Sequence, residues 1–577
     1  MRIYFEDYLY PPHLLEEYFG KMLEPYEGKV RTRYVGYVYN KAKYDGPIFI
    51  LPKALLLKRG GKYTFLGMKN AEPEKIIDLE SPSNPLYGKE IIGEISGFSI
   101  WVHQVIRRFY DENKKTSIVE EAELRRSSAS TSSGKKDLLS AAMQLVDFFK
   151  EHETIFTTIT KENHSGNNNT SWQRTISRTQ PYIDQKTQEP MYVQTVNKKK
   201  ELDTNEKLII LFYSVLNYLK KEYHLKISLG DLIYPIMPAA KVGTMVSSGI
   251  TQKEIKGNKS SYFREDLREL WKLLDAFFKY NRSTDEQKRD LLVVGNFHIV
   301  FEAMIDKLLS DQDIPDKLKY QNDDKIVDHI YLDRSLTGTD SNIYFIGDSK
   351  YYKDANDITG VPLYKQFTYA RNAIQYNIDQ FYLKHKKNPN AIRYRDDETD
   401  GYNITPNFFI SPRIEVGNLD FTTPSFGPTD WLPKPNKHFE DRLFDRDTLL
   451  LREYNINLIF LIAAYGAYED CWTSTLRTTI REDMIALLNK LYVFFEVVPE
   501  PIPLYSGNNK VGEIPFINYH YNRLRGKIYK VDDDSKSLLI AFERETRTGK
   551  DDLADALENV PSSVAGETLG APIKLKP

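Results

Sequence analysis

Two aspartates and a lysine in two short apolar segments have the types and spacing for hydrolytic chemistry. In "DKIVDHIYLD", residues 324–333, Asp328 lies on the same face of an expected strand as its apolar neighbours two positions away. In "NIYFIGDSK", residues 342–350, Asp348 and Lys350 share one face for the same reason. Turn-forming residues separate the two segments, which predicts an antiparallel hairpin in which Asp328 approaches Asp348.

Two neighbouring carboxylates repel each other, so ionising both at neutral pH requires a counterion or raises a pKa. A divalent metal removes this conflict. Mg²⁺ prefers carboxylate oxygen and commonly uses one or two side chains, which leaves positions for water and a phosphate oxygen. Lys350 can orient the attacking water and offset charge on phosphorus. These residues therefore predict metal-assisted phosphodiester hydrolysis, with Asp328 and Asp348 binding Mg²⁺, for which Mn²⁺ can substitute.

Helices are expected on either side of the hairpin. "GNFHIVFEAMIDKLL", residues 295–309, has the apolar spacing of a helix and places Glu302 at the margin of the apolar stripe, where it can act as a further metal ligand. A second helix carries Lys365, Gln366 and Tyr369 at spacings of three and four, so one face can present all three to a DNA phosphate.

This ordered set resembles the PD-(D/E)XK nuclease superfamily. The matching residues are Glu302, Asp328, Asp348 and Lys350, and Gln366 with Tyr369 is similar to the helix motif of the RecB-like branch. The resemblance implies an α/β fold with a PD-(D/E)XK mixed-sheet core. It also implies a nuclease activity that uses these residues.

A wider resemblance extends beyond the core. "KVRTRYVGYVYN", "HSGNNNTSWQRTI" and "HFEDRLFDRDTLLLREYNINLIFLIAAY" are similar to segments of LlaJI-type restriction endonucleases and McrC-type nuclease subunits. This resemblance implies DNA restriction in a prokaryotic defence system, with a McrB-type GTPase as a possible separate partner. The chain has no G-x-x-x-x-G-K-[ST] phosphate loop, so a nucleotide-driven motor of that kind must be a partner.

The order of the expected elements places these residues in one α/β core. It contains a helix over 296–310, strands over 324–333 and 342–350, a helix over 362–385 and a strand over 407–412. "NINLIFLIAAY" is expected to add a buried strand, and the segment from Thr473 a packing helix.

The rest of the chain divides by composition. Residues 1–125 carry aromatic and β-branched runs, including "EIIGEISGFSIWVHQVI", and predict a β-rich module for recognition or partner docking. Residues 126–136 predict a flexible linker, and 137–290 a helical region. The nuclease domain is expected over 291–500, and an extension with a disordered tail over 501–577.

Composition limits the function classes. The chain of 577 residues has 79 Lys and Arg against 81 Asp and Glu, a net charge of −2, so any affinity for a polyanion must come from a local patch. The single cysteine, Cys471, excludes an intramolecular disulfide framework. The longest apolar run is too short to cross a bilayer. These features predict a cytoplasmic protein with no membrane association.

Several other residues have a functional and a structural interpretation. His298, one turn before Glu302, and Trp172, in a polar loop with Arg174, are interpreted as packed side chains in preference to a catalytic group and a base-stacking wedge. His329 is expected on the face opposite Asp328. The lysines of 197–201 are interpreted as a solvated charge run, and Asp445 and Asp447 as charges at the start of a helix.

The sequence thus predicts a Mg²⁺-dependent endonuclease that cuts double-stranded DNA in a restriction or phage-defence system. Cutting both strands needs two centres, so we expect a homodimer or a multisubunit assembly. Two alternatives stay open. One is a RecB-like exonuclease or repair nuclease, and the other is a non-catalytic scaffold that docks DNA or a GTPase.

Overall fold

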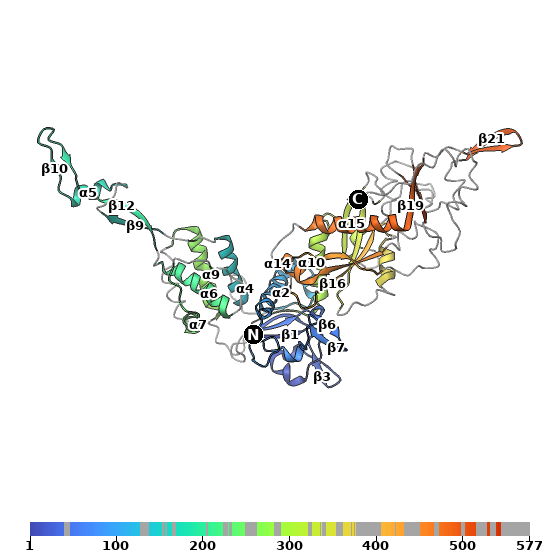
Figure 1. The fold of residues 1–577 in the computed structure, drawn as a ribbon, viewed down its shortest axis with the longest axis horizontal. Helices are drawn as coiled ribbons and strands as arrows, with labels where there is room; N and C mark the ends of the chain where they lie inside the picture. Colours follow the sequence, from blue (N-terminus) through green and yellow to red (C-terminus); the bar gives the residue numbers. More distant parts are fainter. Residues whose placement is uncertain are drawn as a thin grey trace.

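A computed structural model gives the fold of the chain (Figure 1). It describes residues 1–543 except 40–46, 127–137, 153–154, 156–157, 164–168, 204–205, 223–228, 230–233, 249–261, 282–289, 321–325, 335, 337–341, 353–361, 371, 374–375, 377–405, 420, 422, 432–450, 467–471, 498–501, 515–527 and 531–537. The predicted linker at 126–136 lies almost wholly outside the described residues, as do Cys471, Asp445, Asp447 and the predicted tail beyond 543.

The N-terminal module is built on a five-stranded sheet of order β1-β5-β4-β13-β8. Its strands are β1 (Arg2–Phe5), β5 (Ile48–Leu51), β4 (Val35–Tyr39), β13 (Asp290–Val294) and β8 (Arg125–Arg126). Strand β13 comes from the start of the region predicted as the nuclease domain, yet it pairs with β4 and β8. The chain therefore returns to the N-terminal sheet after the helical region and before it forms the second sheet.

Helix α2 (Ile91–Asn113) corrects one prediction, because it contains the segment that was expected to be β-structure. Its buried residues recur every three or four positions, which is the helical period, and include Ile95, Phe98, Val102, Val105 and Phe109. Two glycines, Gly93 and Gly97, interrupt this run and obscure the pattern in the sequence. Twenty-three residues of helix thus replace the expected strands.

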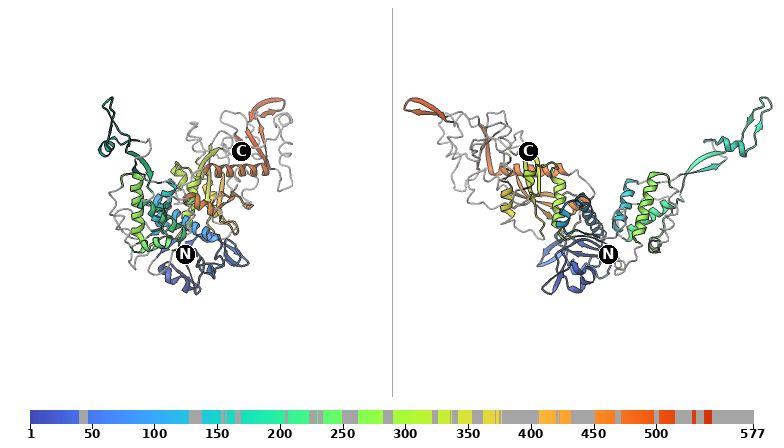
Figure 2. Two further views of the ribbon diagram at one scale, coloured as in Figure 1. Left: turned by 60° about the vertical axis from the view of Figure 1, so that its left-hand side comes forward. Right: turned by 180° about the vertical axis from the view of Figure 1, so that it is seen from behind.

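The helical region contains α4 (Leu138–Glu151), α6 (Lys207–Glu222), α7 (Ala239–Ser248) and α9 (Glu265–Asn281), whose apolar faces share one core. A long arm projects from it, away from the rest of the molecule (Figures 1 and 2). The arm consists of the ribbon β9 (Thr158–Asn163) and β12 (Asn197–Leu202), helix α5 (Trp172–Arg178) and the short hairpin β10 (Tyr182–Ile183) and β11 (Pro190–Met191).

Trp172 lies on this arm with 58% of its surface exposed, so its predicted core packing is wrong. The Trp172 ring has an edge-to-face contact with Tyr192 of the same arm, with the ring centres 6.4 Å apart. Its neighbour Arg174 forms an ion pair with Glu162 of the ribbon.

A second five-stranded sheet carries the candidate site and has the order β14-β15-β16-β18-β17. Its strands are β14 (His329–Arg334), β15 (Asn342–Ser349), β16 (Asn407–Arg413), β18 (Leu451–Asn457) and β17 (Phe426–Pro428). The central strands β15, β16 and β18 are parallel, and both edge strands are antiparallel to their neighbours. The expected mixed α/β architecture is confirmed.

Helices cover both faces of this sheet. On one face, α10 (Phe297–Leu309) and α15 (Thr473–Leu491) share a core with the sheet's aromatic residues Tyr331, Phe345, Phe408 and Tyr454. On the other face, a helix over 362–370 packs Leu363 and Phe367 against Phe409 and Leu451. Beyond α15 the chain forms β19 (Tyr492–Val497), β20 (Ile502–Ser506), β21 (Asn509–Ile514), β22 (Ile528–Lys530) and β23 (Leu538–Glu543).

The apolar run after β18 corrects a second prediction, because Leu458–Gly466 is helix α14 and not a continued strand. The Asn457 carboxamide oxygen accepts hydrogen bonds from the backbone N–H groups of Ile459 and Phe460, which starts the helix. Every residue of α14 is buried, so the sequence has no polar face to reveal the helical period.

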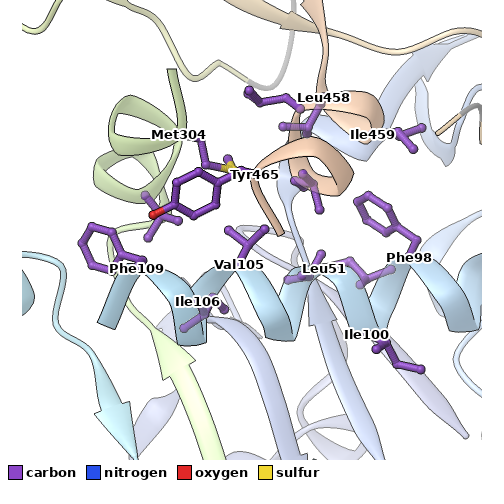
Figure 3. Close-up of a cluster of buried hydrophobic side chains, with 14 of the residues drawn as sticks. Leu51, Phe98, Ile100, Val105, Ile106, Phe109, Met304, Leu458, Ile459 and Tyr465 are labelled. Atoms are coloured by element: carbon purple, nitrogen blue, oxygen red, sulfur yellow. The ribbon is translucent and has the colours of Figure 1, made fainter. Parts of the chain in front are cut away.

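Helix α14 joins the two sheets into one body. It packs against α2 of the N-terminal module and α10 of the second sheet (Figure 3). The ring of Tyr465 lies beside Arg108 at 4.3 Å, and its hydroxyl donates to Glu112 at 2.6 Å. Among the described residues, none of the helices is long and apolar enough to span a membrane.

Candidate functional site

The predicted hairpin is confirmed and brings the two aspartates together. β14 and β15 pair antiparallel, with His329 opposite Gly347. One step along, Asp328 stands opposite Asp348, and the Asp328 carboxylate accepts a hydrogen bond from the backbone N–H of Ser349 at 3.1 Å. The local alternation of the strands therefore places both carboxylates at the end of β15.

Asp348 is almost fully buried, with 1% of its surface exposed, and two ammonium groups approach it. Lys350 forms an ion pair with one carboxylate oxygen, and Lys365 Nζ lies 3.7 Å from the other. The Lys350 ammonium also lies 5.7 Å from the centre of the Phe409 ring on the next strand. The predicted Asp-X-Lys pair thus lies on one face of the sheet, and Lys365 joins it from the covering helix.

Glu302, on α10, lies close enough to the two aspartates and the two lysines for their charges to change its pKa. Burial, and then the negative charges of Asp328 and Asp348, raise the pKa of Glu302 to about 8, although Lys350 and Lys365 act in the opposite direction. Burial and Asp328 likewise raise the pKa of Asp348 to about 6 against the two lysines. The charge of Asp328 therefore opposes ionisation of both Glu302 and Asp348, and the charge of Asp348 opposes ionisation of Glu302.

Gln366 and Tyr369 have a different position from the predicted one. Both are buried, with 0% of their surface exposed. Gln366 donates to the carbonyl of Ile346 at 3.2 Å, and the Tyr369 hydroxyl donates to the carbonyl of Ile326 at 2.8 Å. These two side chains tie the helix to the strands that carry the aspartates. Lys365 keeps 34% of its side chain exposed and can still meet a phosphate.

The two histidines near the site have separate surroundings. His329 is fully buried, its Nε2 lies 2.6 Å from Ser349 Oγ, and its Nδ1 lies 3.5 Å from Asp306. Burial opposes ionisation of Asp306, but His329 and Lys319 outweigh it and lower the pKa of Asp306 to about 2. His298 is exposed and not packed as predicted; partial desolvation and Lys53 lower its pKa, against Asp328.

Residues of the N-terminal module also reach the site, which the sequence did not indicate. Tyr351, the residue after Lys350, donates its hydroxyl to the buried carboxylate of Glu6 at 2.7 Å. Lys53 lies 3.6 Å from Glu6 and 5.2 Å from the centre of the Tyr351 ring. No local pattern could have revealed this contact, because 345 positions separate Tyr351 from Glu6.

We expect Tyr351→Phe to destabilise the protein by about 2 kcal/mol at pH 8, since a hydrogen bond to a charged group contributes about 1.5–3 kcal/mol. Burial raises the pKa of Glu6 to about 7, so the loss should be smaller at pH 5, where Glu6 is protonated in the folded protein. Urea unfolding at the two pH values measures the difference. Tyr352→Phe, at an exposed neighbouring position, is the control. An equal loss at both pH values would contradict this role for the hydroxyl.

Gly347, directly before Asp348, is needed for close packing. A Cβ atom there would overlap the ring of Phe408 on β16. We therefore expect Gly347→Ala to lower the free energy of unfolding by about 1–3 kcal/mol, which is typical of overpacking. The substitution should also displace Asp348. Phe408→Leu in the same chain should recover part of the loss. Gly427→Ala, where no heavy atom lies within 4 Å of the added Cβ, should be neutral in the same unfolding assay.

The donor set fits a hard divalent cation. Among the described residues, no group of three or more His, Cys, Asp or Glu side chains forms a ready metal cage. Mg²⁺ does not require one, because it commonly binds one or two carboxylates and completes its coordination with water and phosphate oxygen. Asp328 and Asp348 supply such oxygens, and burial followed by the charge of Asp328 raises the pKa of Asp348, so a bound cation would favour its ionised form.

Comparison with known proteins gives little further information. No protein-family model matches the chain, and no curated protein matches it. Among solved structures, the chain is similar to a half-complex from a tetradecameric assembly of Thermococcus gammatolerans McrB AAA+ hexamers with bound McrC. The sequence identity is 12% and the TM-score 0.26, over 78% of this chain and 84% of that chain. A likeness at this TM-score carries no argument about fold or activity.

Proposed function

We propose that this chain is a Mg²⁺-dependent DNA endonuclease of the PD-(D/E)XK kind that hydrolyses phosphodiester bonds of double-stranded DNA. One observation carries the proposal. At a strand end where Lys350 and Lys365 approach the buried Asp348, burial and then the charge of Asp328 raise the pKa values of both Glu302 and Asp348. Perturbed pKa values of this kind cluster at functional sites.

Each residue has a role in the proposed reaction. Asp328 and Asp348 hold the metal, with Glu302 assisting, and a bound Mg²⁺ or Mn²⁺ supplies Lewis-acid activation of the phosphate and of water. The Lys350 ammonium offsets the charge that builds on phosphorus in the transition state. Lys365 holds the neighbouring phosphate, because its ammonium is both partly exposed and close to Asp348.

The test is cleavage of a covalently closed circular plasmid. Purified protein should nick or linearise the circle with Mg²⁺, and EDTA should abolish cutting. Lys350→Ala should remove the activity while the protein stays folded. Degradation of linear DNA with an untouched circle would favour the exonuclease alternative. Binding without any cutting, unchanged in Lys350→Ala, would favour the non-catalytic scaffold.

A restriction system with a separate McrB-type GTPase is part of the same proposal. The exposed apolar side chains of the arm favour a protein partner, because a monomer normally covers such side chains. They include Trp172, Ile176, Tyr182, Ile183 and Val193. A gene for a McrB-type GTPase or a DNA methyltransferase beside this one would support the system, and a neighbourhood without either would count against it. Cutting both strands would then take place in a homodimer or a multisubunit assembly.

A further inference from the structure

A cavity of about 780 Å³ adjoins the candidate site. One wall is the hairpin β6 (Leu56–Arg59) and β7 (Lys62–Phe65) of the N-terminal module, which contributes Lys58 and Arg59. The opposite wall is the second sheet. Lys350 itself lines the cavity, so the space opens directly beside the proposed catalytic lysine.

The cavity continues the sheet face that carries Asp348 and Lys350. Residues paired across parallel strands point to the same face, and Asp348 pairs with Phe409, which pairs with Glu453. Glu453 lines the cavity two strands away from Asp348, which is about 10 Å at the usual strand spacing. Lys350 and Glu453 both line the cavity, so a strand with its phosphate at Lys350 can extend within the cavity toward Glu453.

The lining has the chemistry of a nucleotide site. Four cationic side chains, Lys58, Arg59, Lys350 and Arg413, face one carboxylate, Glu453. Trp431 also lines the cavity, which gives a base a ring to stack on. Phosphate contacts and base stacking together are how proteins bind single-stranded nucleic acid.

One polar group can also contact a base edge. The Glu453 carboxylate accepts hydrogen bonds from Ser411 at 2.9 Å and Thr429 at 3.0 Å, which hold it in place. A carboxylate oxygen has two lone pairs, so Glu453 can still accept from an exocyclic amino group, as acidic side chains do from cytosine.

The cavity has a volume of about 780 Å³. The volume lies within the range of about 300–1,000 Å³ typical of ligand sites. Such a site can hold an unpaired nucleotide.

We infer that this cavity binds an unpaired nucleotide of the DNA strand, next to the phosphate held at Lys350, with the N-terminal module supplying part of the substrate site. The inference rests on the proposed function and deepens it. The N-terminal hairpin then selects strands that can be unpaired at the cut.

The test uses the full chain and a fluorescent single-stranded oligonucleotide in metal-free buffer with EDTA, so that binding is measured without cutting. Lys58→Ala with Arg413→Ala should weaken binding at least tenfold. Both side chains are exposed, so the double variant should stay folded. Each lost phosphate contact lowers the slope of log K against log salt by about 0.7 for a single strand, so the pair should lower it by about 1.4. Trp431→Ala should weaken binding about tenfold.

Lys62→Ala, in the same hairpin but outside the cavity, is the matched control and should bind as the original chain does. Unchanged affinity and salt slope in the Lys58 and Arg413 variant would overturn the inference, whatever the cleavage result. Loss of binding in that variant, together with no Mg²⁺-dependent cleavage by the unsubstituted chain, would uphold the cavity and remove the nuclease proposal. The cavity inference and the nuclease proposal can therefore be contradicted independently of each other.

Discussion

Asp348→Asn should lower Mg²⁺-dependent plasmid cleavage about 10³-fold. The substitution removes one of two carboxylates proposed to hold the metal. Metal activation supplies several kcal/mol of transition-state stabilisation, and each 1.4 kcal/mol is a factor of ten in rate. Initial rates of supercoil loss, measured over a range of Mg²⁺ concentrations, give the ratio. The deficit should persist at high Mg²⁺ concentration, because the amide oxygen of asparagine carries no negative charge to offset that of the cation.

The matched control for this variant is Asp313→Asn, an exposed aspartate in the segment between α10 and β14, which should cleave at the original rate. Asp348→Asn should also keep its folded circular dichroism spectrum, because it replaces a nearly isosteric side chain. A folded Asp348→Asn protein that cuts within tenfold of the original rate would end the proposed role of Asp348.

The metal-free protein should lose stability as pH rises from 5 to 9. The pKa of Glu302 is about 8 in the folded protein against 4.5 for a free side chain, and that of Asp348 is about 6 against 3.8. Between these values the folded state binds more protons than the unfolded state, so its stability falls with rising pH. The effect is small below about pH 4 and complete only above about pH 9, where Glu302 is ionised in both states. At about 1.4 kcal/mol per pKa unit, the two shifts amount to several kcal/mol.

Other ionisable side chains also contribute to the pH dependence of stability, each in a known direction. Glu6, with a pKa of about 7, acts in the same direction as Glu302. The lowered pKa of His298 acts in the opposite direction, and only at pH values below 6.5, the pKa of a free histidine side chain. Asp306, with a pKa of about 2, contributes stability that is lost only as pH falls through that value, outside the range measured.

Glu302→Gln isolates the contribution of the site. It should stabilise the metal-free protein at pH 9 by a few kcal/mol and change little at pH 5, as measured by urea unfolding. Saturating Mg²⁺ should flatten the profile of the unsubstituted chain, because a bound cation neutralises the same charges. Glu415→Gln, at an exposed position in the loop after β16, should have no effect at either pH. A gain of equal size at pH 5 would show that electrostatics at this site is not the cause.

Much of the candidate site could be predicted because it depends on local pattern. Alternation in the two strands put Asp328, Asp348 and Lys350 on one face, and the apolar stripe of α10 placed Glu302 at its margin. The same reasoning was wrong for α2 and α14. In α2 the glycines hid a helical period, and in α14 burial on every side removed the polar face that would have shown it.

The sequence by itself determined which charged residues could meet, because a strand hairpin is set by neighbours along the chain. Only the tertiary structure decided what surrounds them. Gln366 and Tyr369 became buried ties between a helix and a sheet, and Tyr351 met Glu6 across 345 positions. The cavity beside Lys350 is lined from both the N-terminal hairpin and the second sheet. Such contacts arise from packing between distant segments, where pairing depends on the complementary shapes of folded surfaces and leaves no period in the sequence.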